Sequence, residues 1–83
     1  MYRIVRLSSK ESEQQDSRLA VIASGFTDSA AASFTAANWV RRHCPQARYD
    51  EETGRWLMED HDGWMHSFFV EPTVRHRAGG PER

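Results

Sequence analysis

Ionisable side chains gather near the C-terminal end of the chain, at Glu59, Asp60, His61, Asp62 and His66. Imidazole and carboxylate groups this close in sequence could bind a metal ion or transfer protons. His61 and His66 are the best metal candidates, but zinc sites normally show closely spaced Cys or His pairs, and the acidic residues do not follow the calcium-loop pattern. Because short carboxylates also stabilise turns, we predict no metal and no other cofactor.

Catalytic arrangements are equally weak. Glu59 and His66 could form an acid–base pair across a hairpin, although an exposed ion pair explains them as well. Cys44 follows His43, but neighbouring residues on a helix point about 100° apart, and the negative end of a helix opposes a thiolate. Gly79 and Gly80 have no helix after them to cradle a phosphate. We therefore expect that the protein is not an enzyme.

A second group of residues could bind single-stranded nucleic acid. Aromatic side chains on a sheet stack bases, and arginines contact phosphates; the candidates are Tyr49, Arg55, Trp56 and Phe68. Against this, 11 basic residues are balanced by 12 acidic ones, which leaves a net charge of −1. A nucleic-acid partner is consequently only our alternative prediction.

The elements that must position these residues begin with two expected strands, residues 2–7 and residues 18–25. Arginines on the first strand suggest a place at the sheet margin, and apolar residues on both faces of the second suggest a central one. Residues 8–17 contain no apolar side chain, so we predict a mobile polar loop there.

A helix is predicted between Phe26 and Pro45. Thr27 or Asp28 can cap its start, and Pro45 should end it near His43 or Cys44. The helical period places Ala30, Phe34, Ala37, Val40 and Cys44 on one face. A second apolar column contains Ala32, Ala36, Trp39 and His43, which is more than a helix on one sheet requires.

Three further strands are expected at residues 47–50, 55–59 and 64–70, joined by turns that end in Gly54 and Gly63. A three-residue loop in the second turn would set Trp56 opposite Phe68, whereas a two-residue loop would set Leu57 there. The sequence leaves both registers open.

The order of elements (β-β-α-β-β-β) predicts an α+β fold, with one antiparallel sheet and a single amphipathic helix on one face. We expect one domain over residues 1–72 and a disordered tail over residues 73–83. The predicted core is Ile4, Leu19, Val21, Phe34, Ala37, Val40, Trp56, Met58, Phe68 and Val70.

The last two strands carry apolar side chains on both faces, and one helix can cover only one of them. Surplus apolar surface of this kind marks interaction sites. We therefore predict a protein–protein interaction or regulatory module, which could pair with itself as a homodimer. The expected interaction surface is Trp39, Leu57, Trp64, Met65 and Phe69. With one cysteine and no segment suited to secretion or membrane insertion, we expect a cytoplasmic protein without a membrane partner.

Overall fold

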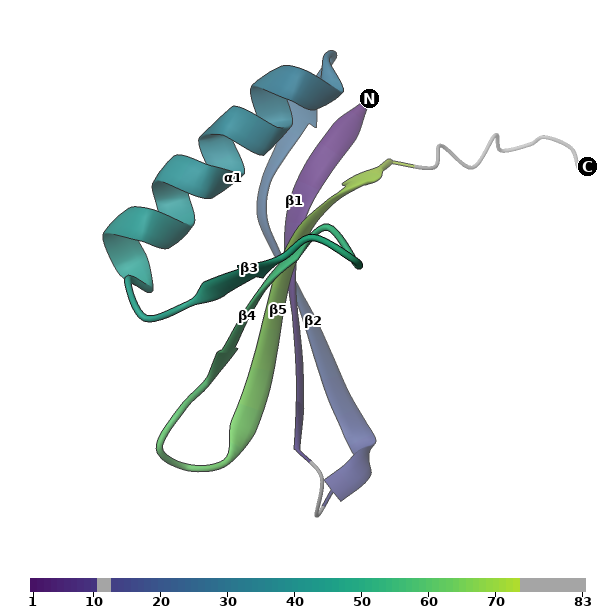
Figure 1. Ribbon diagram of the computed structural model, residues 1–83. Coiled ribbons are helices and arrows are strands. Elements are labelled where there is room, and N and C mark those ends of the chain that lie inside the picture. Colours follow the sequence, from purple (N-terminus) through teal and green to yellow (C-terminus); the bar gives the residue numbers. More distant parts are fainter. Residues whose placement is uncertain (11–12, 74–83) are drawn as a thin grey trace, which may run out of the picture.

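The computed structural model describes residues 1–10 and 13–73 of the chain. Five strands and one helix follow one another in the predicted order (Figure 1). The strands are β1 (Tyr2–Lys10), β2 (Glu13–Phe26), β3 (Arg48–Asp50), β4 (Arg55–Glu59) and β5 (Trp64–Pro72), and the helix is α1 (Ser29–His43).

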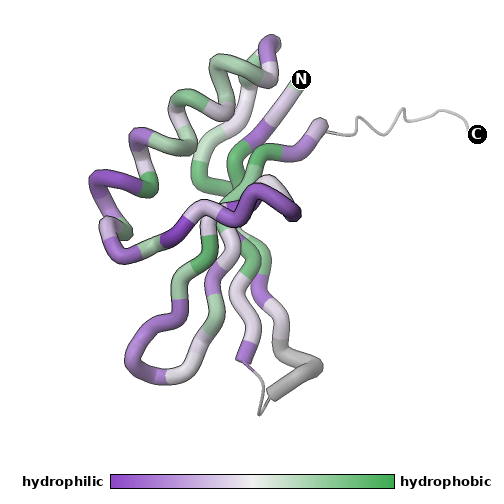
Figure 2. Tube along the Cα trace, viewed as in Figure 1, coloured by the Kyte–Doolittle hydropathy of each residue, from purple (hydrophilic) through white to green (hydrophobic). Residues whose placement is uncertain are grey.

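All strands belong to one twisted sheet with the order β2-β1-β5-β4-β3, and every neighbouring pair is antiparallel. The helix lies on one face and contacts β5, β1 and β2. In Figure 2 hydrophobic segments meet where the strands cross, whereas the β4–β5 turn is mostly hydrophilic. The predicted α+β fold is confirmed.

The predicted positions of the first two strands were wrong. β1 is central, between β2 and β5, and β2 is an edge strand. An arginine is compatible with a central strand where its long side chain reaches a polar partner. Arg3, for example, forms an ion pair with Glu71 on β5.

The predicted loop over residues 8–17 was wrong wherever the structure describes it. Residues 8–10 continue β1 and residues 13–17 begin β2, so the hairpin is much longer than apolar content alone suggested. Of the predicted tail, Thr73 is described, and its amide donates a hydrogen bond to the carbonyl oxygen of Met1 at 2.7 Å. Residues 74–83 lie outside the described residues.

The limits of α1 agree with the prediction. Asp28 is the N-cap, and its Oδ1 accepts a hydrogen bond from the amide of Ala30 at 3.1 Å. Cys44 ends the helix, with its amide bonded to the carbonyl oxygen of Val40 at 2.7 Å, as expected for a residue that precedes a proline.

The helix faces the sheet with residues from both predicted columns. Ala32, Ala36 and Val40 are buried, whereas Phe34 is 72% exposed. Small alanines allow the helix to approach the sheet closely, and the larger Trp39 beside them contacts Phe68 with ring centroids 5.6 Å apart. The helix side of the core therefore combines Ala32, Ala36 and Trp39 of the column that we regarded as surplus with Val40 of the predicted face, whereas His43 is exposed.

Among the predicted core residues, Ile4, Val40 and Phe68 are fully buried. Leu19, Val21 and Phe34 were assigned wrongly, because all three are at least half exposed. The sheet contributes Val5, which is fully buried on the face away from the helix. Four predicted residues are half-buried: Ala37, Trp56, Met58 and Val70.

The two predicted turns contain glycines that require the left-handed region, Gly54 with φ of 71° and Gly63 with φ of 89°. Each turn begins with an aspartate whose carboxylate accepts local hydrogen bonds. The register of the final hairpin is the one that pairs Trp56 with Phe68 and Met58 with His66.

Candidate functional site

Large apolar side chains cover the sheet face that points away from α1. We call this surface the open face, and it consists of Leu7, Leu19, Val21, Leu57, Met65 and Phe69. Leu19, Val21 and Met65 are 53%, 50% and 42% exposed. Among the described residues no helix or loop covers this face.

Strand register brings the open face together from four strands. Leu7 of β1 lies opposite Leu19 on one side and Ser67 on the other, and Ser67 lies opposite Leu57 of β4. In the adjacent row Val5 lies between Val21 and Phe69. The buried Val5 thus sits in the middle of an apolar surface whose neighbouring side chains remain accessible.

Charges of both signs surround the open face. Near β3 a hollow of about 680 Å³ is lined by Leu57 and Met65 together with Arg48, Asp50 and Glu59. The Arg55 guanidinium lies 4.0 Å from the ring centroid of Phe69, in a cation–π arrangement. This surface combines an apolar centre with a charged margin, the composition found in protein–protein interfaces.

The predicted interaction residues are divided between the two faces. Leu57, Met65 and Phe69 lie on the open face, as the alternation of the final hairpin suggested. Trp39 and Trp64 lie on the helix side, where Trp39 packs on Phe68. Trp64 faces Lys10 and Arg18, whose charged groups lie 5.8 Å and 4.8 Å from its ring centroid.

Sequence reasoning missed the contribution of the first hairpin to the open face, namely Leu7, Leu19 and Val21. Alternation along β2 did not give this division, because strict alternation places Ala23 on the same face as Leu19 and Val21. A register shift next to Val5 breaks the alternation, so that Ala23 pairs with Ile4 on the helix side, as Ala20 does with Arg6. A helix that packs through alanines matches small residues on the sheet beneath it.

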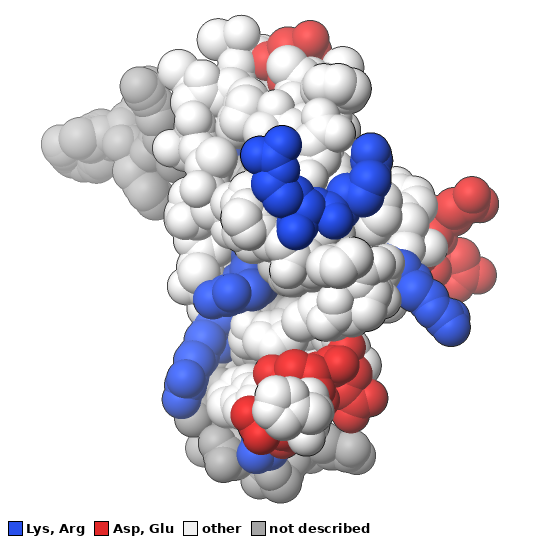
Figure 3. Space-filling view, turned by 90° about the vertical axis from the view of Figure 1, so that its left-hand side faces the viewer, with Lys and Arg blue, Asp and Glu red and all other residues white. Residues whose placement is uncertain are grey.

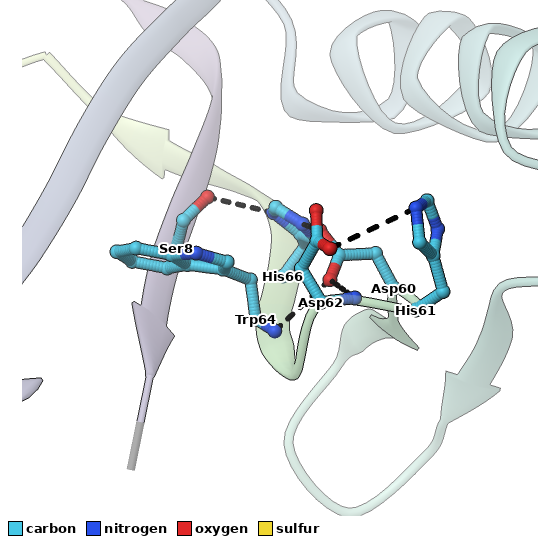
Figure 4. A network of polar contacts seen from close by, with 6 residues as sticks. All are labelled: Ser8, Asp60, His61, Asp62, Trp64 and His66. Atoms are coloured by element: carbon cyan, nitrogen blue, oxygen red, sulfur yellow. Dashed lines mark hydrogen bonds and ion pairs between the residues drawn. The ribbon is translucent and has the colours of Figure 1, made fainter. Parts of the chain in front are cut away.

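A polar network connects the β4–β5 turn with β1 (Figure 4). Nδ1 of His66 lies 2.8 Å from Oγ of Ser8, and its Nε2 lies 3.0 Å from Oδ2 of Asp60. Oδ1 of Asp60 accepts hydrogen bonds from the amides of Asp62 and Trp64 at 2.9 Å and 3.0 Å. Sequence reasoning paired His66 with Glu59, but Glu59 is exposed on the other face and Asp60 is the actual partner.

Hydrogen bonding determines the protonation of this network. The His66 imidazole, followed by the Trp64 and Asp62 amides, lowers the pKa of Asp60 to about 2. Because a carboxylate only accepts, Nε2 of His66 donates to it, and in the neutral imidazole Nδ1 then accepts from the Ser8 hydroxyl.

The network resembles the carboxylate–imidazole–hydroxyl relay that activates a serine nucleophile. Here, however, the Ser8 residue is only 6% exposed, so its hydroxyl is poorly accessible to a substrate. The arrangement instead provides hydrogen-bond partners for the half-buried His66 and the buried Ser8. These bonds hold the β4–β5 turn against β1.

The weak metal candidates do not come together. His66 is engaged on both ring nitrogens, and His61 is 93% exposed, with Nε2 3.8 Å from Oδ1 of Asp62. Within residues 1–10 and 13–73 no group of three His, Cys, Asp or Glu side chains is arranged to hold a metal ion.

The nucleic-acid candidates are not presented on a common surface. Phe68 is 1% exposed beneath the helix and Trp56 packs against Tyr49 with centroids 4.9 Å apart, whereas Arg55 lies on the open face. Figure 3 shows acidic and basic groups on the same side of the molecule, without a continuous basic surface in view. Only Tyr49 and Trp56 lie together, so the four residues do not form one stacking surface with an arginine beside it.

Cys44 is half-buried, and burial raises the pKa of its thiol more than nearby Arg6 lowers it. Among the described contacts, the His43 ring packs against the Trp39 ring, with centroids 4.5 Å apart, and not against this thiol. This environment favours the unreactive thiol.

Comparisons with protein-family models, with curated proteins and with solved structures found no match. In the described part of the chain, no helix has the length and hydrophobicity required to span a membrane.

Proposed function

We propose that the protein is an interaction module that self-associates through the open face. The observation that carries the proposal is the exposure of Leu19, Val21 and Met65 on one side of the sheet. Each Å² of apolar surface removed from water stabilises a complex by about 25 cal/mol. A partner that covers these side chains therefore forms a complex with a stabilisation that the isolated chain lacks.

The margin of the open face supports a second copy as the partner. Arg48 and Glu59 carry opposite charges on one surface, and a two-fold axis places the same surface on both subunits. A basic group of one copy can then meet an acidic group of the other. The small net charge of −1 adds little repulsion between copies.

Sedimentation equilibrium over a wide concentration range tests this proposal. The wild-type protein is expected to change from monomer to dimer, and Leu19→Glu is expected to abolish the dimer because it buries an unpaired charge in the interface. Phe34→Glu is the matched control, since Phe34 is even more exposed but lies on the helix.

A wild-type protein that stays monomeric at every concentration would contradict the proposal. So would a Leu19→Glu variant that dimerises like the wild type, or a Phe34→Glu variant that loses the dimer to the same extent. Circular dichroism of each variant establishes that the monomer is folded before its association is compared.

A further inference from the structure

A second feature lies on the helix side of the sheet. A cavity of about 410 Å³ opens between the first half of α1 and the strands β3 and β4. The helix lies over β5, β1 and β2. Tyr49 of β3 and Trp56 of β4 belong to the same face of the sheet, but they lie beside the helix and not beneath it. Tyr2 and Val70 complete the sheet side of the cavity, and Ser29 and Ser33 lie on the helix side.

Two walls of different chemistry face each other across this cavity. The rings of Tyr49 and Trp56 have centroids 4.9 Å apart and are inclined at 57°, and they form an aromatic wall. Opposite them the helix presents Ala36 and Ala37, whose small side chains leave the space open. An aromatic wall facing small side chains suits a flat molecule, because stacked and edge-to-face ring pairs are favourable.

Charge further limits the ligand. None of the described residues that line the cavity is Asp, Glu, Lys, Arg or His. A charged ligand would lose part of its hydration there without gaining a countercharge, which disfavours it relative to a neutral one. The hydroxyl groups of Ser29 and Ser33 can still form hydrogen bonds with a neutral polar group.

From these observations we infer that the cavity binds a small, uncharged, planar aromatic molecule. The ring lies against Tyr49 and Trp56, and a hydrogen-bonding group points toward Ser29 and Ser33. The volume falls within the range of about 300–1,000 Å³ typical of small-molecule sites. This site opens on the helix side of the sheet and shares only Phe69 with the open face proposed for self-association, among the described lining residues.

Indole is a suitable probe, and tryptamine and indole-3-acetate are its positively and negatively charged counterparts. In ¹H–¹⁵N NMR titrations of the whole chain, indole is expected to shift the amides of Ser33, Ala37 and Gly54 saturably. We expect a dissociation constant of about 1 mM or below, a realistic value for a ligand of this size. Each charged counterpart is expected to bind at least tenfold more weakly.

Ser33→Trp places a large side chain in the mouth of the cavity and is expected to weaken indole binding at least tenfold. Ala31→Trp is the matched control, since Ala31 is also exposed on α1 but does not line the cavity. If Ser33→Trp fails to fold, Tyr49→Ala takes its place. It removes half of the aromatic wall from a position that is 52% exposed and is expected to give the same loss.

Three outcomes would overturn the inference. They are the absence of saturable shifts around the cavity, equal binding of indole and its charged counterparts, and wild-type affinity in the cavity variants. None of these depends on the oligomeric state, because Leu19→Glu, which leaves the cavity unchanged, is expected to bind indole like the wild type. A failure of self-association is therefore distinguishable from a failure of this site.

Discussion

The ring of Trp39 lies 5.6 Å from the ring of Phe68, centroid to centroid, and this contact joins α1 to the centre of the sheet. Phe68 is 1% exposed and occupies the strand next to β1. Trp39 is accordingly a packing residue of the helix, and its substitution tests stability rather than association.

Trp39→Ala is expected to lower the free energy of unfolding by about 2 kcal/mol. This is less than the 3–5 kcal/mol typical of fully buried aromatic residues, because Trp39 is only half-buried. Phe34→Ala serves as the control and is expected to change stability by less than about 0.5 kcal/mol, as is usual for exposed positions. Urea denaturation measures both, and equal losses would show that the contact with Phe68 contributes little.

Asp60 should give the protein a specific dependence on acid. Its pKa is lowered to about 2 in the folded state, below the ordinary value of about 3.9 in an unfolded chain. The folded state therefore binds this proton less readily, so the stabilisation is present above about pH 4 and is lost as the pH falls toward 2.

Asp60→Asn is expected to be less stable than the wild type at pH 7, with a difference that shrinks as the pH falls from about 4 to 2. Urea midpoints at several pH values measure this difference. Asp62→Asn is the control, because its carboxylate is 68% exposed. A difference between Asp60→Asn and the wild type that stays constant down to pH 2 would show that the Asp60 carboxylate is not held ionised by His66 and the turn amides.

Ser8→Ala leaves Nδ1 of the half-buried His66 without its hydrogen-bond partner. The expected loss of stability is about 1–2 kcal/mol, the usual consequence of an unsatisfied polar group. Ser9→Ala, one residue along the same strand but on the opposite face, is expected to cost less than about 0.5 kcal/mol. The comparison by thermal or urea unfolding decides whether the Ser8–His66 contact stabilises the sheet, since equal effects would exclude it.

Asp28→Ala removes the side chain that accepts from the Ala30 amide. It should destabilise the protein by about 1 kcal/mol, as for other N-caps. Thr27→Ala is an informative control, because the sequence alone allowed Thr27 as the cap. A larger loss for Thr27→Ala than for Asp28→Ala would assign the cap to Thr27, and helix content by circular dichroism should follow the same order.

Much of the fold could be predicted because its signals are local. The Asp28 cap, Pro45, and the glycines at Gly54 and Gly63 act on neighbouring backbone, and each places a helix end or a turn where the structure has it. The alternation of the final hairpin likewise assigned Leu57, Met65 and Phe69 to one face, which is half of the open face.

The remaining half of that surface, together with the polar network, depends on which strands become neighbours. Ser8 and His66 are 58 residues apart in sequence, and no local pattern connects them. Leu19 and Val21 looked like core residues because apolar side chains are normally buried, but the strand that carries them is at the sheet edge and turns them away from the helix.

The sequence by itself determined the kind and order of the elements, since capping, glycine turns and proline act within a few residues. Only the tertiary structure decided that β1 is central, that the alanine column of α1 faces the sheet, and that one sheet face stays open. These outcomes follow from packing between distant segments: a helix with small side chains approaches closely and covers one face, and no described element covers the large apolar residues of the other face.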